Sequence, residues 1–121
     1  MIIYLIGSLK NSMIPELTVR LNKEGHETFS EWYSPGPDAD DYWRDYTKIL
    51  GVSHKAAMNS HHCWNVYNFD KTHLDRCDVG IMVMPAGKSG HLELGYLIGQ
   101  GKKGYILFDK EPERYDIMQR F

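Results

Sequence analysis

The amino-acid sequence predicts an α/β fold, in which a parallel β-sheet of four or five strands lies between layers of helices. Two observations predict this class. Short continuous apolar runs, typical of strands that are buried on both faces, recur along the chain. Longer segments whose apolar residues follow helical spacing lie between them. Strands that alternate with helices form parallel sheets joined by right-handed crossovers.

The chain begins with a clear strand. Ile2 to Ile6 is a continuous apolar run that ends at Gly7-Ser8. A helix is expected next, because Gly25 is a natural end for a segment with apolar residues on one helical face. Those residues are Ile14, Leu17 and Leu21. Residues 26–32 predict a second, weaker strand.

Two helical segments fill the middle of the chain. Asp38 is expected to cap a helix that Gly51 closes. Residues 54–77 are mostly helical in pattern, but a single helix of 24 residues would span about 36 Å, more than a small domain needs. We therefore expect a break near Asn68-Phe69-Asp70, which places Asp70 at the start of a short helix.

The last third of the chain repeats the alternation. Residues 79–84 form the strongest predicted strand, and Pro85-Ala86-Gly87 is its turn. A helix over residues 91–99, a strand over 104–108 and a terminal helix over 113–121 follow.

These elements predict one domain, residues 1–121, with a small flavodoxin-like or Rossmann-like fold of three layers. The expected strand order is 2-1-3-4, and a fifth strand, if formed, would lie beyond the fourth. Ligands of such sheets bind beyond the carboxyl ends of the strands. Polar residues at that edge are therefore the candidates for a functional site.

The composition narrows the classes of function. The 121 residues carry a net charge of −2, with 42% hydrophobic and 25% charged residues, which is ordinary for a globular domain. This charge does not indicate a nucleic-acid polymer as partner, and no apolar run approaches the roughly 18 residues of a membrane span. Cys63 and Cys77 form no disulfide framework, so we expect a reduced, cytoplasmic setting.

Several potential zinc ligands lie in the middle of the chain. They are His54, His61, His62, Cys63 and His73. No three or four of them have the spacing of a familiar ligand set. We therefore expect neither a metal nor a cofactor.

Topology separates the candidate carboxylates. Each crossover helix runs antiparallel to the strands, so its N-terminus lies at the edge where the strands end. Glu93, in the first turn of its predicted helix, and Asp70, at a predicted helix start, are both placed there and can meet across a cleft. The helix N-terminus would favour the ionised form of Glu93. Asp78 begins a strand, lies at the opposite edge and is expected to be structural.

Both carboxylates also have a simpler interpretation. An Asp at a helix start is commonly only an N-cap. A first-turn Glu is commonly a surface residue that complements the helix dipole. The sequence alone leaves these roles open for Asp70 and Glu93.

Two Gly/Ser turns adjoin the same edge. Gly7-Ser8 ends the first strand, and Ser89-Gly90 precedes the helix of Glu93. Backbone N–H groups at such turns bind anions or hydroxyls, although glycines there can also serve only to shape a tight turn. Neither turn matches a Walker loop or a dinucleotide fingerprint.

Aromatic and histidine side chains complete the candidates. Trp32 and Tyr33 could stack on a planar ligand such as an aromatic ring, and His91, beside Glu93, could contact a ligand bound at this edge. Three further aromatic residues at helical positions are expected in the core or in a subunit contact: Trp43, Trp64 and Tyr67.

Two blocks of the sequence carry a family resemblance, residues 70–84 and 89–102. Asp70 stands eight residues before Asp78, and Glu93-Leu94-Gly95-Tyr96 is followed by Gly99-x-Gly101-Lys102. This pattern resembles the nucleoside 2-deoxyribosyltransferase family and its hydrolase relatives, the 2′-deoxynucleoside 5′-monophosphate N-glycosidases. The resemblance covers most of the chain in outline, and Gly7-Ser8 is similar to the hydrolase branch.

The resemblance implies a function and roles for particular residues. It implies cleavage of the N-glycosidic bond of a small nucleoside or nucleotide by a cytoplasmic homo-oligomer, followed by hydrolysis or by transfer of the sugar to another base. Glu93 would be the nucleophile, Asp70 would support the base and its departure, and Trp32-Tyr33 would contribute to the base pocket. The sugar would form a covalent bond to Glu93.

The sequence departs from the transferase pattern in one position. The transferases carry an acidic residue about six positions before the nucleophile, where this chain has Gly87. Lys88, Ser89 and Gly90 would instead suit an anionic 5′-phosphate, which favours the monophosphate branch and hydrolysis. The chain is also short at its C-terminus, where the transferases complete the site of a neighbouring subunit.

Two alternatives remain open at this point. The first is a glycohydrolase of NAD or another N-riboside, because such enzymes also use a single Glu in a nucleotide-binding α/β fold. The second is a non-catalytic nucleotide-binding or sensor domain. Release of nicotinamide would indicate the first, and full biological activity of a Glu93→Gln protein would indicate the second.

Overall fold

The computed structural model describes residues 1–121 and confirms the predicted α/β class. Four strands form one sheet in the predicted order β2-β1-β3-β4, and every neighbouring pair is parallel. The strands are β1 (Ile2–Ile6), β2 (Glu27–Phe29), β3 (Val79–Val83) and β4 (Lys103–Leu107). The strand order reverses between β1 and β3, as in a small flavodoxin-like or Rossmann-like domain.

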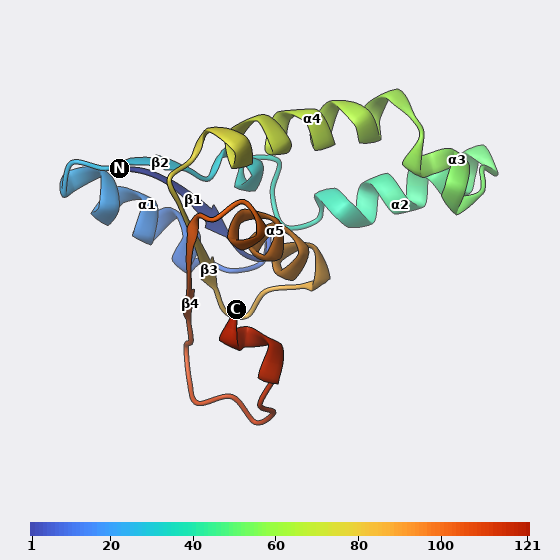
Figure 1. Cartoon of the computed structure of the whole chain (residues 1–121). Coiled ribbons are helices and arrows are strands. Elements are labelled where there is room, and N and C mark those ends of the chain that lie inside the picture. Colours follow the sequence, from blue (N-terminus) through green and yellow to red (C-terminus); the bar gives the residue numbers. More distant parts are fainter.

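Helices cover both faces of the sheet (Figure 1). They are α1 (Met13–Lys23), α2 (Ala39–Leu50), α3 (His54–Met58), α4 (His61–Arg76) and α5 (Lys88–Gly99), with 3-10 turns at Glu31–Tyr33 and Ile117–Arg120. Helix α1 packs on one face, and α5 with the C-terminal half of α4 packs on the other. None of these helices combines the length and the apolar character required to cross a membrane.

The core has two halves because successive side chains of a strand point to opposite faces. Tyr4 and Ile6 of β1 pack with residues of α4 and α5. Ile3 and Leu5 pack with Ile14 of α1. Strand β1, buried on both faces, is therefore the centre of the domain.

Helix α5 packs closely on the sheet because both the helix and the strands carry glycines at the contact. A Cβ atom on Gly80 of β3 would overlap Leu97 Cδ1, and one on Gly104 of β4 would lie 2.7 Å from Leu94 Cδ1. On the helix itself, a Cβ on Gly90 would lie 2.9 Å from Ile6 Cγ2. These distances leave no room for a side chain, so glycine sets the depth at which α5 lies on the sheet.

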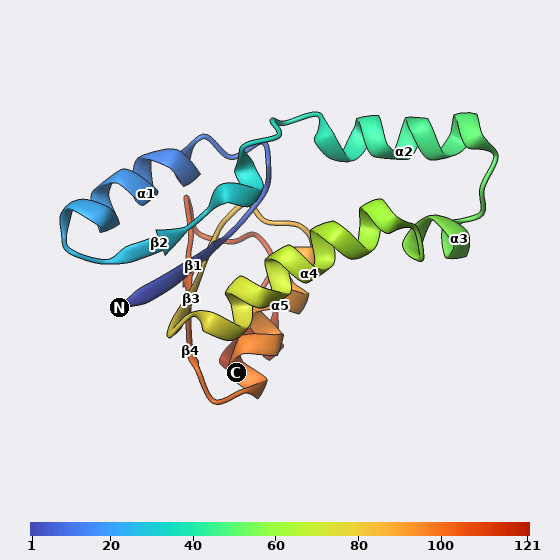
Figure 2. The same cartoon turned by 90° about the horizontal axis from the view of Figure 1, so that it is seen from above.

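Helices α2 and α3 extend beyond the sheet, as the two views of Figures 1 and 2 agree. The predicted helix break near residues 68–70 is wrong. The break lies at Asn59 and Ser60, where the Ser60 side chain accepts a hydrogen bond from Cys63 N at 3.2 Å and caps α4. Ser53 caps α3 in the same way, whereas the Asp38 side chain makes no capping hydrogen bond to α2.

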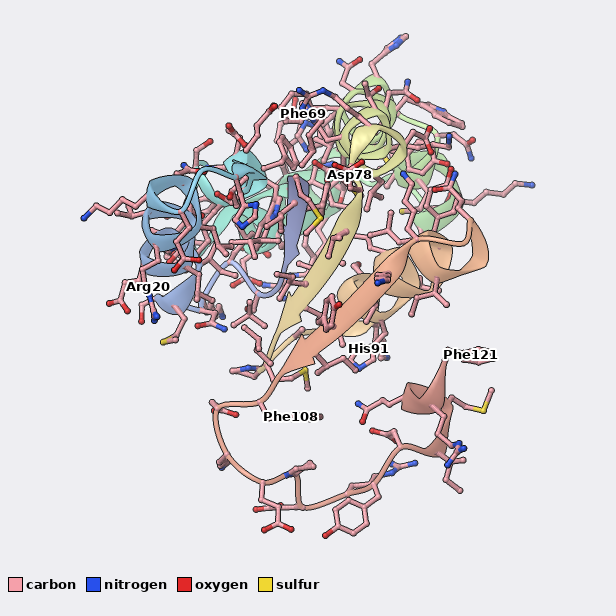
Figure 3. The ribbon with its side chains drawn as sticks, turned by 60° about the vertical axis from the view of Figure 1, so that its left-hand side comes forward. Arg20, Phe69, Asp78, His91, Phe108 and Phe121 are labelled. Atoms are coloured by element: carbon pink, nitrogen blue, oxygen red, sulfur yellow. The ribbon has the colours of Figure 1, made fainter.

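The other differences concern the ends of elements. Strand β2 is limited to three residues, and residues 31–33 form a 3-10 turn in place of the end of the predicted strand. The predicted terminal helix over residues 113–121 is wrong, because only the turn Ile117–Arg120 forms. In Figure 3 the chain after Phe108 loops away from the sheet before it reaches Phe121. Its apolar side chains are exposed, and a short helix without packing is marginal.

The close contact at Gly80 predicts that a side chain added at this position lowers the stability of the domain. Gly80→Val should lower the free energy of unfolding by about 1–3 kcal/mol, because the added methyl groups meet buried Leu97 and Leu94. Gly95→Ala, on the open side of the same helix, should be neutral or stabilising by up to about 1 kcal/mol. Urea unfolding of both variants measures this. Equal stability of Gly80→Val and the wild type would contradict the close packing.

Candidate active site

A cleft of about 260 Å³ lies between α4 and α5. It is lined by Tyr67, Asp70, Lys71, Leu74, Leu92, Glu93 and Tyr96. The two predicted catalytic carboxylates, Asp70 from α4 and Glu93 from α5, thus face one cavity with mostly apolar walls. They come from segments that are separated by β3 in the chain and that the crossover brings together.

Glu93 lies in the second turn of α5, and the prediction that it occupies the first turn is wrong. The helix begins at Lys88, three residues earlier than expected, with Gly87 in the cap position. The expected preference for the ionised form is also wrong. Burial, and then the charge of Asp70, raise the pKa of Glu93 to about 7, and a hydrogen bond from the Tyr4 hydroxyl only partly opposes this rise.

Asp70 lies in the middle of α4 and not at a helix start. The N-cap interpretation is therefore excluded for this residue. Burial raises its pKa to about 6. Its Oδ1 atom is buried and has no hydrogen-bond partner within the protein. An unpaired buried acceptor is costly unless it is protonated or bonded by a ligand.

Tyr4 is the third member of the group, and the sequence interpretation missed it. Its side chain is fully buried on the face of β1 that α4 and α5 cover. Burial, followed by the charges of Glu93 and Asp70, raises the pKa of the Tyr4 hydroxyl above its ordinary range, so this group acts as a donor. The sequence did contain a signal for Tyr4, because its hydroxyl is the one polar side-chain group in the buried run Ile2–Ile6.

A polar network closes one end of the cleft. Asp75 Oδ2 accepts a hydrogen bond from Lys71 Nζ at 2.8 Å, and its Oδ1 accepts from the Tyr96 hydroxyl. Gln100 Nε2 donates to Asp75 Oδ1 at 3.2 Å and to the Tyr96 hydroxyl at 3.0 Å. Helices α4 and α5 are therefore joined at this end by side chains as well as by apolar packing.

Lys102 adds a second connection at the same place. Its Nζ atom donates to the backbone oxygens of Leu74 and Asp75, at 2.7 and 2.8 Å. A lysine at this position satisfies carbonyls that the helix end leaves unpaired. Lys102 of the sequence signature thus holds the C-terminal end of α4.

The two predicted Gly/Ser segments follow the ends of the neighbouring strands β1 and β3. Gly7 packs closely, since a Cβ there would lie 2.9 Å from Ile14 Cδ1. Ser8 Oγ accepts a hydrogen bond from Lys10 N at 3.1 Å. Gly90 is buried against β1 in the first turn of α5, so it does not form the expected turn before the helix. Packing therefore explains both glycines.

The polar residues at the start of α5 are exposed. Lys88 and His91 line a second, more open hollow that shares Leu92 with the cleft. His91 Nδ1 lies 2.9 Å from the backbone oxygen of Gly87. Ser89 is exposed one helical turn before Glu93.

The predicted base-stacking residues belong to the 3-10 turn after β2. Trp32 Nε1 donates to the backbone oxygen of Leu5 at 2.8 Å, and its ring packs against both halves of the core. Tyr33 meets this ring edge-on, with centroids 5.9 Å apart. Neither residue lines the cleft, whereas Tyr67 does.

Asp78 lies at the opposite edge of the sheet, as expected. Its Oδ2 atom accepts a hydrogen bond from the backbone N–H of Ile2 at 2.8 Å. This bond joins the start of β1 to the start of β3. Asp78 therefore lies at the edge of the sheet where the strands begin, and it does not line the cleft.

Comparisons of the chain with known protein families, with curated proteins and with solved structures found no match.

The raised pKa values predict a characteristic dependence of stability on pH. A carboxyl whose pKa is higher in the folded state binds its proton more tightly there, so stability falls as pH rises from about 4 to about 7. Glu93→Gln should therefore raise the free energy of unfolding at pH 8 by roughly 1–3 kcal/mol and change it little at pH 4.5.

Urea unfolding across this pH range measures the effect, and Glu113→Gln, an exposed change, is the control. A Glu93→Gln protein that is no more stable than the wild type at pH 8 would show that Glu93 does not carry a strained charge.

Proposed function

We propose that this chain cleaves the N-glycosidic bond of 2′-deoxynucleosides or their 5′-monophosphates through a covalent glycosyl–Glu93 intermediate. The pair of carboxylates with raised pKa values in one cleft carries the proposal. Such pairs are typical of glycoside-cleaving sites, where one carboxyl must be ionised while the other holds a proton. The resemblance of the sequence to the nucleoside 2-deoxyribosyltransferase family supports the choice of substrate.

In the first step Glu93, in its ionised form, attacks the anomeric carbon while Asp70 holds the proton. Because the pKa of Glu93 is near 7 and that of Asp70 near 6, this is the minor of the two singly charged forms of the pair, and the reaction draws on it from the equilibrium between them. A bond forms between this carbon and a Glu93 oxygen, while the bond to the base nitrogen breaks and its electron pair leaves with the base. Protonated Asp70 donates a proton to the departing base. The Tyr4 hydroxyl donates a hydrogen bond to Glu93, which favours the ionised form of this carboxyl.

In the second step water or another base attacks the same carbon and releases Glu93. Asp70, now ionised, accepts the proton of the attacking group. We propose hydrolysis as the main outcome, because Gly87 offers no carboxylate to bind an acceptor base. Exposed Lys88 and Ser89 near the cleft favour an anionic 5′-phosphate on the substrate.

We further propose that the protein is a cytoplasmic homo-oligomer. No residue of α2 is buried, although its Tyr42, Tyr46, Ile49 and Leu50 share one apolar face. An exposed apolar face of this kind marks a contact with another chain. The two cysteines are unpaired, which suits a reducing compartment.

Base release tests the proposal directly. The wild type should release free base from a panel of deoxynucleosides and deoxynucleoside monophosphates, as followed by chromatography with and without an acceptor base. Glu93→Ala should abolish release, Asp70→Asn should slow it roughly 10²–10⁴-fold, and the exposed change Glu113→Gln should leave it unchanged.

Glu93→Ala that cleaves at the wild-type rate would contradict this scheme. Release of nicotinamide from NAD, in place of base from deoxynucleotides, would identify the N-riboside glycohydrolase instead. Tight nucleotide binding without any cleavage would identify the non-catalytic sensor domain.

The rate should also show a bell-shaped dependence on pH. Because the two carboxyls titrate near 6 and near 7, the state with a single negative charge is most populated between these values. The maximum of kcat/KM should lie in this range, and Asp70→Asn should lose the alkaline limb. A profile that is flat from pH 5 to 8 would contradict the sharing of one charge by the pair.

A further inference from the structure

Lys71 is a cation that lines the same cleft as the two carboxylates. It follows Asp70 in α4, and the cleft is about 260 Å³ in volume. A free ammonium group in such a cavity would pair with Glu93 or Asp70 and stabilise their ionised forms. Charge on Lys71 therefore conflicts with the raised pKa values on which the proposed chemistry depends.

The structure resolves this conflict with contacts at the end of the cleft. Lys71 Nζ lies 2.8 Å from Asp75 Oδ2, one helical turn further along α4, and 5.5 Å from the centre of the Tyr96 ring. Tyr4 from β1 and Asp70 from α4 act directly on Glu93, and the other titratable groups that line the cleft are Tyr67 and Lys71 from α4 and Tyr96 from α5. Lys71 is the only cation among them, and its charge is directed to Asp75.

Asp75 is itself held in place from α5. Its Oδ1 atom accepts hydrogen bonds from the Tyr96 hydroxyl and from Gln100 Nε2. An isolated exposed ion pair is weak because two long side chains must be ordered. Because Tyr96 of α5 and Gln100 at its C-terminal cap already donate to Asp75, this carboxylate is ordered without Lys71 and offers it a fixed partner.

We propose that Asp75 is a positioning residue that holds the Lys71 ammonium at the rim of the cleft, away from Asp70 and Glu93. This role deepens the proposed function and rests on it for its meaning in catalysis. Asp75 does not contact Asp70 or Glu93, but its hold on Lys71 would affect the pKa values of both carboxyls. The effect passes through one named cation, which makes it separable from a general role in stability.

A set of three variants tests the proposal by carbon-13 NMR titration of the Glu93 carboxyl without substrate. Asp75→Asn keeps an acceptor for Tyr96 but removes the charge, so released Lys71 should lower the pKa of Glu93 by about one unit. Lys71→Met alone should leave this pKa near the wild-type value. The double variant should restore it, because the displaced cation is no longer present.

An unchanged Glu93 pKa in Asp75→Asn would overturn the proposal. A lowered pKa that the double variant fails to restore would also overturn it, because the effect would then be one of general structure. The NMR readout requires no turnover, so it stands even if the chain cleaves none of the tested substrates. If the chain does cleave them, the alkaline limb of the kcat/KM profile, which lies near the higher of the two pKa values, should move to lower pH with the Glu93 pKa.

Discussion

The close packing of α5 on the sheet is the contact on which the rest of the structure depends. Because Gly80, Gly104 and Gly90 have no side chains, nothing at these three positions holds the helix away from the sheet. The helix can then bury Leu94 and Leu97 fully against the strands. The same approach brings Glu93 down beside the Tyr4 hydroxyl and toward α4, so a packing constraint creates the chemical environment of the site.

That environment carries a cost in stability. Asp70 and Glu93 lose water in an apolar cleft, and burial destabilises their ionised forms; the charge of Asp70 destabilises that of Glu93 further. The Asp70 oxygen that has no hydrogen-bond partner adds to this cost. Groups strained in this way cluster at functional sites, because selection tolerates destabilisation where it serves chemistry.

The sequence predicted the sheet well because apolar runs such as Ile2–Ile6 report burial on both faces, and crossover rules then determine strand order. It failed where tertiary contacts decide. The break in the long helix follows the Ser60 cap and not the length of the domain.

The same limit applies to the site. Topology placed Asp70 and Glu93 together, although it assumed the wrong turn for each. The expected charge state of Glu93 was wrong because burial outweighs a helix dipole whose effect fades after the first turn. The pair should hold one charge near neutral pH, because burial raises both pKa values and the charge of Asp70 raises that of Glu93 further. Titration of both carboxyls by carbon-13 NMR, in the wild type, Tyr4→Phe and Asp70→Asn, tests it most directly. Glu93 should titrate near 7 and Asp70 near 6, Tyr4→Phe should raise the Glu93 pKa, and Asp70→Asn should lower it. Ordinary carboxyl pKa values that neither variant changes would contradict it.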